Sequence, residues 1–266
     1  MNEDLPVTID PAFVHGLEER AARGEAKAMF DLGCLHDIPV KIGVPLDLGI
    51  ARGWYTRAAE AGHPWAQFAL GNMMERAQGG PRNDLQARRW YDSAARQGVA
   101  EAQMHLGDML QAGRGGPADL PEAARWYDRA AAQGHEVAAT RLALLHLEGR
   151  LPEADPDRAR SLLEFAADKL DGQAHLILGD IHLRGIGVPR HGGLAVVHYC
   201  VAVLRLAPGP DADRALAARE HLLSRQPQLR DEYESQARAF VAARLPGGDH
   251  SLAARREGDR STEDHP

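Results

Sequence analysis

The sequence repeats itself every 36 residues or so, and this regularity limits the possible folds more than any other feature. An anchoring leucine recurs in steps of 38, 36, 36 and 36 residues, at Leu32, Leu70, Leu106, Leu142 and Leu178. A second anchor recurs at constant steps of 36 residues, at Trp54, Trp90, Trp126, Leu162 and His198. Two anchors that keep one period through five units indicate an array of repeated modules rather than a single core.

Each unit carries the signals of two helices. A small residue precedes the anchoring leucine by four positions, at Ala28, Ala66, Ala102, Ala138 and Ala174. The next residue after the leucine is glycine in every unit except the fourth, which has Ala143 instead of the equivalents of Gly33, Gly71, Gly107 and Gly179. On a helix these small residues share one side, so they predict the close approach of a partner helix.

The second helix of each unit has its own start and stop signals. A capping residue stands seven positions before the second anchor in the first four units, at Asp47, Asn83, Asp119 and Asp155. Glycine closes the first three units, at Gly62, Gly98 and Gly134. The tryptophan anchors beside paired alanines predict buried rings between neighbouring units. Because the chain is 44% hydrophobic but only 5% aromatic, alanine and leucine dominate its apolar content, which favours helices.

The unit pattern resembles the Sel1-like repeat family, a relative of the tetratricopeptide repeats. The residues that carry this resemblance are A-x-x-x-L-G, a glycine-rich turn, and D-x-x-x-A-x-x-W-Y-x-x-A-A-x-x-G. It implies an all-α, right-handed α-solenoid of stacked antiparallel helix pairs. Five repeats are expected, at about 26–62, 64–98, 100–134, 136–170 and 172–204. The fourth departs most from the pattern, because Leu162 and Leu163 replace Trp-Tyr and Leu170 replaces the closing glycine.

The flanks of the array are expected to cap it. Residues 1–25 contain a helical pattern from Pro11 to Arg23, which predicts an N-terminal capping helix. Residues 205–245 contain two further amphipathic segments and are expected to form C-terminal capping helices. Residues 246–266 are polar and glycine-containing, so we expect a disordered tail.

No motif predicts catalysis, a metal or a cofactor. The 13 histidines include no HExxH or similar ligand spacing, and those that follow the anchoring leucine by four positions lie in different units. Cys34 and Cys200 match no ligand spacing and are interpreted as small apolar residues. The net charge of −7 argues against a nucleic-acid or membrane partner. The acidic start of the chain predicts no signal peptide or membrane span, and therefore a cytoplasmic setting.

Binding of another protein or peptide has more support than catalysis. In stacked helix pairs the first helices line the concave wall, where partners are usually held. The candidate partner-binding residues on this wall are Phe30, Trp65, Phe68, Asn72, Glu75, Met104, Asp108, Gln111, Thr140, Leu144, Leu176, Asp180 and Arg184. Trp65 is the expected anchor, because a large amphipathic ring suits such a surface. For Phe30 and Phe68 an alternative is equally open, in which they pack against the next unit.

The resemblance implies an adaptor or scaffold that binds a partner along the concave face without turnover. Bacterial relatives in the family also include immunity proteins that neutralise a secreted toxin, which is the first alternative. A hydrolase is the second alternative, since some relatives bind penicillin-like ligands.

Overall fold

The computed structural model describes residues 9–38 and 44–245, and every regular element within these ranges is helical. In chain order the helices are α1 (Pro11–Ala22), α2 (Ala26–Asp37), α3 (Leu48–Glu60), α4 (Pro64–Glu75), α5 (Asp84–Arg96), α6 (Ala100–Ala112), α7 (Leu120–Ala132), α8 (Glu136–Leu147), α9 (Pro156–Asp168), α10 (Gly172–Arg184), α11 (Gly192–Arg205), α12 (Pro210–Leu223), the 3-10 turn η1 (Pro227–Leu229) and α13 (Arg230–Ala242). The predicted all-α class is confirmed. The tail expected to be disordered, 246–266, lies outside the described residues.

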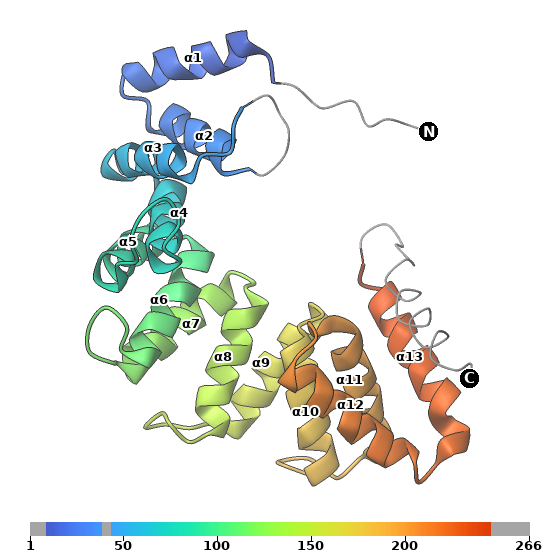
Figure 1. The fold of residues 1–266 in the computed structure, drawn as a ribbon. Coiled ribbons are helices and arrows are strands. Elements are labelled where there is room, and N and C mark those ends of the chain that lie inside the picture. The colour runs from blue at the N-terminus through green and yellow to red at the C-terminus, as the bar shows by residue number, and fades with distance from the viewer. Residues whose placement is uncertain (1–8, 39–43, 246–266) are drawn as a thin grey trace, which may run out of the picture. The chain divides into compact units, whose positions relative to one another are not determined.

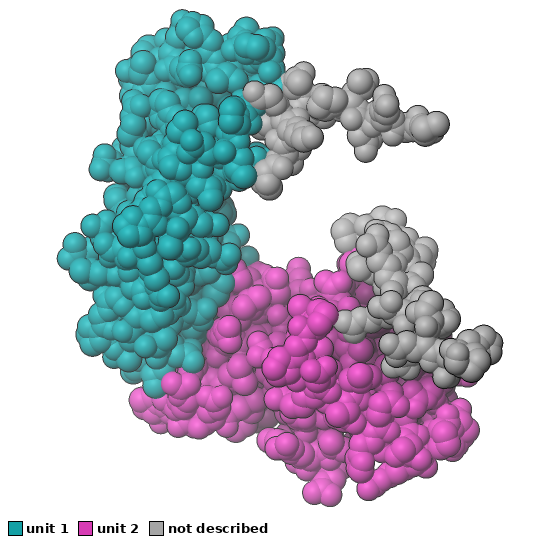
Figure 2. All heavy atoms as spheres, in the orientation of Figure 1, with its two compact units in different colours: residues 1–133 teal, residues 134–266 magenta. Residues whose placement is uncertain are grey.

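The chain divides into two compact parts, which are called unit 1 (residues 1–133) and unit 2 (residues 134–266) from here on (Figure 2). The 36-residue modules are called repeats. Within unit 1, α2 packs with α3, α4 with α5, and α6 with α7, while α1 packs on α2 (Figure 1). Within unit 2, α8 packs with α9 and α10 with α11, and α12 and α13 both pack on α11. These adjacent pairs match the helix pairing that the repeat pattern predicts.

The predicted helix starts and stops are in place. The side chain of Asp47 accepts a hydrogen bond from Ile50 N at 2.9 Å, and Asp119 accepts one from Glu122 N at 2.9 Å, so both cap a second helix. The closing residues Gly62, Gly98 and Gly134 have φ of +87°, +92° and +94°. Leu170 keeps the left-handed conformation of this position, with φ of +65°, and its side chain is buried. The fourth repeat therefore keeps the turn geometry without its glycine.

One turn of unit 1 carries a residue that its conformation disfavours. Ala77 has φ of +57°, whereas the equivalent positions of the later repeats, Gly113, Gly149 and Gly185, have φ of +66°, +64° and +74°. Because a β-carbon is strained in this conformation, we expect Ala77→Gly to raise the free energy of unfolding of unit 1 by about 0.5–1 kcal/mol. Urea denaturation checks this, with Ala61→Gly as a control that should lower stability because Ala61 has φ of −77°. An unchanged midpoint for Ala77→Gly would contradict the expectation.

Each glycine that follows an anchoring leucine makes room for a tyrosine ring of its own repeat. A β-carbon added at Gly33, Gly71, Gly107 or Gly179 would lie 2.5 to 2.9 Å from the ring of the second-helix tyrosine, namely Tyr55, Tyr91, Tyr127 or Tyr199. All four rings are buried. In the fourth repeat Ala143 replaces the glycine and Leu163 replaces the tyrosine, and both are buried. Where the first helix has alanine instead of glycine, the second helix has leucine instead of the larger tyrosine.

The tryptophan anchors are less deeply buried than the sequence predicts. Trp126 is buried, but Trp54 and Trp90 are only half-buried. The guanidinium of Arg57 lies 4.4 Å from the centre of the Trp54 ring, and that of Arg129 lies 4.5 Å from the centre of the Trp126 ring. The neighbouring tyrosines, rather than the tryptophans, are the consistently buried rings.

A buried side chain ties successive repeats together through a backbone carbonyl. In unit 1, Gln67 Nε2 donates to Ala59 O at 3.1 Å and Gln103 Nε2 donates to Ala95 O at 3.0 Å, so each first helix is bonded to the second helix before it. In unit 2, His175 occupies the same repeat position and its Nε2 lies 3.1 Å from Ala167 O. The fifth repeat keeps this contact with an imidazole instead of an amide.

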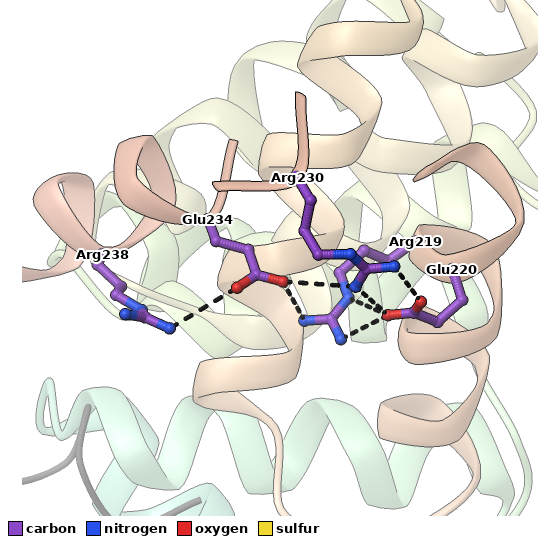
Figure 3. Close-up of polar contacts among 5 residues, drawn as sticks. All are labelled: Arg219, Glu220, Arg230, Glu234 and Arg238. Atoms are coloured by element: carbon purple, nitrogen blue, oxygen red, sulfur yellow. Dashed lines mark hydrogen bonds and ion pairs between the residues drawn. The ribbon is translucent and has the colours of Figure 1, made fainter. Parts of the chain in front are cut away.

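A network of charged side chains joins α12 to α13 (Figure 3). Glu220 on α12 accepts from Arg230 Nη2 at 2.7 Å and from Arg219 Nη2 at 2.8 Å. Glu234 on α13 lies 3.8 Å from Arg219 Nη1 and 3.7 Å from Arg238 Nη2. The hydrogen bond from Arg230, with a further one from Arg219, lowers the pKa of Glu220 to about 2. These ion pairs join the C-terminal helices, in addition to an apolar cluster that includes Leu223 of α12 and Ala237 of α13.

Candidate partner-binding surface

The strongest candidate surface lies on the first helices of unit 1, α2, α4 and α6, and is called here the first-helix face of unit 1. Trp65, in the first turn of α4, is 44% exposed and its ring meets Phe68 edge-on, with ring centres 6.1 Å apart. Phe68 in turn lies 5.9 Å from the ring of Tyr91 and 5.7 Å from that of His105. Tyr91 and His105 are stacked at 5.1 Å. These four rings form an aromatic cluster with Trp65 at its exposed edge.

Each second-helix tyrosine also meets a polar side chain near the end of its own first helix. Tyr91 Oη donates to Glu75 Oε2 at 2.8 Å, and Tyr127 Oη donates to Asp108 Oδ1 at 2.6 Å and lies 3.0 Å from Gln111 Oε1. In unit 2, Tyr199 Oη donates to Asp180 Oδ1 at 2.7 Å. Burial, with the adjacent carboxylates, raises the pKa of Tyr91 and Tyr199, so both hydroxyls remain donors at neutral pH. The tyrosines thus hold the carboxylates in fixed positions.

Glu75 is engaged inside unit 1 rather than presented to a partner. Its carboxylate accepts from Tyr91, lies 3.6 Å from His105 Nδ1 and pairs with the guanidinium of Arg114. Its side chain is only 14% exposed. The contact with His105, followed by those with Arg114 and Tyr91, outweighs burial and lowers the pKa of Glu75 to about 2. Because His105 and Arg114 belong to the next repeat, Glu75 joins repeats 2 and 3, and the sequence interpretation of it as a partner contact is corrected.

The two phenylalanines among the candidate partner-binding residues make different contacts. Phe30 stacks on the ring of His63, with centres 4.6 Å apart, and His63 is the N-cap residue of the next first helix, α4. Phe30 is therefore an inter-repeat contact, which is the alternative left open by the sequence. Phe68 touches its own repeat and the next one, yet supports exposed Trp65. The other predicted residues of unit 1, which are half-buried, are Asn72, Met104, Asp108 and Gln111.

In unit 2 most of the candidate partner-binding residues are covered by other parts of the chain. Thr140 and Leu176 are each 1% exposed, so their prediction as partner contacts is wrong. Thr140 Oγ1 lies 3.4 Å from Asp171 Oδ1, and Leu176 belongs to a core cluster that includes Ala215 of α12. Asp180 forms an ion pair at 3.4 Å with Arg214 of α12. Leu144 is half-buried and Arg184 is exposed. Helix α12 therefore occupies part of the surface that a partner would need.

The part of the chain that the structure describes shows no arrangement of three or more His, Cys, Asp or Glu side chains suited to a metal ion. Within the same residues, no helix combines the length and apolar character needed to span a bilayer. Cys34 and Cys200 are both free thiols. The sequence analysis did not predict the hydrogen bonds between the second-helix tyrosines and the carboxylates. The tyrosine that recurs directly after the second anchor could have indicated them.

Helix pairs joined by repeated tyrosine–glycine contacts define an α-helical repeat protein. The family model for the Sel1 repeat matches residues 26–63, 66–99, 100–135, 137–169 and 172–200. The chain belongs to the Sel1 repeat family, as the sequence pattern indicated. A comparison with curated proteins found no match.

Solved structures agree with this assignment. A Sel1 repeat protein from Oxalobacter formigenes is 30% identical with a TM-score of 0.68, covering 80% of this chain and 92% of that one. A protective antigen of uropathogenic Escherichia coli with an SLR fold is 24% identical with a TM-score of 0.74 over 86% of this chain. The present chain covers only 48% of that antigen. An immunity protein from Pseudomonas aeruginosa is similar at 18% identity and a TM-score of 0.42, over 87% of each chain, a likeness too distant to identify a partner.

Proposed function

We propose that this protein is a non-catalytic scaffold that binds another protein through the first-helix face of unit 1. The observation that carries the proposal is Trp65, which is 44% exposed at the edge of an otherwise packed aromatic cluster. Large, rigid rings of this kind dominate the binding energy of protein interfaces, because they bury much apolar area and lose little conformational freedom. Membership in a family of helical-repeat proteins supports the same conclusion.

The surroundings of Trp65 favour a partner segment that combines an apolar anchor with side chains that donate hydrogen bonds. Phe68 and Met104 supply apolar area on neighbouring first helices, and Asp108 and Gln111 supply acceptors on the later turns of α6. The carboxylate of Glu75 is not available in the same way, because it pairs with Arg114. An extended peptide or an amphipathic helix with these features fits a row of first helices.

The test is capture of the partner from native lysate, followed by calorimetry with the purified partner. We expect Trp65→Ala to weaken binding by about tenfold or more, the loss typical of an interface anchor. The matched control is Leu85→Ala, which removes an exposed apolar side chain from α5 on the second-helix side of the same unit. Asp108→Arg is unsuitable, because it would also remove the acceptor of Tyr127. Equal affinities for wild type and Trp65→Ala would refute the assignment of the surface.

A further inference from the structure

Three histidines of the fifth repeat lie together in unit 2. His175 and His182 come from α10 and His198 comes from α11. The Nδ1 atoms of His175 and His198 are 2.9 Å apart, and the rings of His182 and His198 are stacked with centres 5.5 Å apart at 8°. His175 is 1% exposed, and the buried Nδ1 of His182 has no hydrogen-bond partner among the residues that the structure describes. We call these three residues the histidine cluster.

The hydrogen bonds of the cluster define which nitrogens carry hydrogen. His175 Nε2 faces the carbonyl oxygen of Ala167 at 3.1 Å, so this nitrogen must donate and Nδ1 of the neutral ring must accept. His198 Nδ1 is then the donor in the 2.9 Å contact with His175 Nδ1. A proton added to His175 would place two N–H groups against each other unless His198 changed its tautomer. A second proton would place two cations in contact. The packed arrangement therefore suits neutral imidazoles as they stand, takes one proton only after His198 changes its tautomer, and disfavours two.

The charged groups around the cluster do not compensate an added proton. Arg205 on α11 and Arg244, which follows α13, both oppose charging of His175. His191 and Arg160 oppose charging of His182, and only exposed Glu164 favours it. Asp168, at the end of α9, is already paired with Arg244 at 2.6 Å. Burial, aided by neighbouring positive charge, lowers the pKa of His175 to about 4 and that of His198 to about 3.

The side of the cluster nearest the C-terminus is covered by α13. The ring of Phe240 meets His175 at 88° with centres 5.2 Å apart, and the guanidinium of Arg244 lies 3.7 Å from the centre of the Phe240 ring. Ala237 is the only residue of α13 that is buried. By contrast, eight residues of α10 and seven of α11 are buried. Of the elements that contact the cluster, α13 is thus the one most easily displaced.

We propose that α13 is an acid-sensitive cover of unit 2, docked while the histidine cluster is neutral and released when the cluster takes up protons. The sign follows from linkage, because the cluster binds protons more weakly when covered than when open. Docking is fully favoured above pH 6.5, the ordinary value for histidine, and weakens as the pH falls from there toward 4. Release would expose apolar side chains that α13 now covers on α11, including Val196, Cys200 and Val201.

The experiment measures amide hydrogen exchange of the full chain between pH 7.5 and pH 5, with protection factors corrected for the intrinsic pH dependence. In wild type we expect protection of residues 230–242 to fall about 30-fold at pH 5 for each imidazole that ionises only in the open state. Helices α10 and α11 should keep their protection. Unchanged protection of α13 at pH 5 would refute the proposal. Equal loss in α10, α11 and α13 would also refute it, because the cluster would then govern unit 2 as a whole.

The decisive variant is His175→Gln, because unit 1 already carries glutamine at this repeat position. Gln67 and Gln103 make the same carbonyl contact there without a titrating group. We expect His175→Gln to reduce the loss of α13 protection at pH 5 by the factor of about 30 that belongs to that imidazole, and the exposed-site control His221→Gln on α12 to behave as wild type. Should His175→Gln lose helicity at pH 7.5, His198→Leu, which copies Leu162 of the fourth repeat and also removes one imidazole of the cluster, should reduce the loss by a similar factor. A variant that folds but loses as much α13 protection at pH 5 as wild type would contradict the assigned trigger.

Discussion

Gly107→Ala is expected to lower the free energy of unfolding of unit 1 by about 2–3 kcal/mol, the cost of overpacking a tight interior. An added β-carbon would lie 2.5 Å from Cε1 of Tyr127, whose ring is fully buried between α6 and α7. The ring cannot move aside without giving up its hydrogen bond to Asp108. Urea denaturation followed by tryptophan fluorescence measures the loss in the full chain. All four tryptophans, Trp54, Trp65, Trp90 and Trp126, lie in unit 1, so the signal reports on that unit.

The fourth repeat supplies the compensating change. In the fourth repeat, Ala143 takes the place of the glycine and Leu163 takes the place of the tyrosine. The double variant Gly107→Ala with Tyr127→Leu therefore reproduces a pair that the chain already uses. We expect its loss of stability to fall short of the sum of the two single losses by about 2 kcal/mol. Gly53→Ala in α3 is the control, since an added β-carbon there meets nothing within 4 Å and should stabilise the helix slightly. Additive single losses would contradict the steric explanation.

Glu75→Gln is expected to destabilise unit 1 by about 3 kcal/mol. The substitution removes the charge that compensates Arg114 and the carboxylate that contacts His105, in a largely enclosed site. The wild-type carboxylate has its pKa lowered from 4.5 to about 2, so its contribution is complete above pH 4.5 and is lost as the pH falls toward 2. The measurement is the same fluorescence-detected urea denaturation at pH 7 and pH 3. Glu60→Gln, on the exposed side of α3, serves as the control. The difference between wild type and Glu75→Gln should shrink at pH 3, and a difference that does not depend on pH would argue against the role of its charge.

The fold could be predicted from the sequence because the repeat period fixes local structure directly. Helix starts at Asp47 and Asp119 and stops at Gly62 and Gly98 follow from backbone chemistry within a few residues. The glycines after the anchoring leucines correctly indicated close packing. That a tyrosine ring fills the space could not be read from the period, because it depends on the distance and rotation between two helices.

The candidate surface was predicted less completely, for reasons that lie outside the repeats. Leu176 is buried in a cluster formed with α11 and α12, and the repeat pattern does not state where a helix beyond the repeats lies. Glu75 is enclosed by Arg114, which stands 39 positions further along the chain in the turn of the next repeat. The contact between His175 and His198 is absent from the earlier repeats, which carry no histidine at either position, so the repeat pattern could not predict it. Trp65 is exposed, as a partner contact requires, because it precedes the buried Leu70 by five positions and so lies on another side of α4.

The exchange of Gly–Tyr for Ala–Leu in the fourth repeat has a consequence for how such a gene can change. Unequal crossing-over between repeats 3 and 4, at a point between their two helices, would join Gly107 to Leu163 or Ala143 to Tyr127. The first recombinant would contain a void and the second a steric clash, so both would be selected against. Duplication and shuffling are therefore tolerated best when whole hairpins move together, and an engineer who grafts repeats between such chains should cut between hairpins rather than within them.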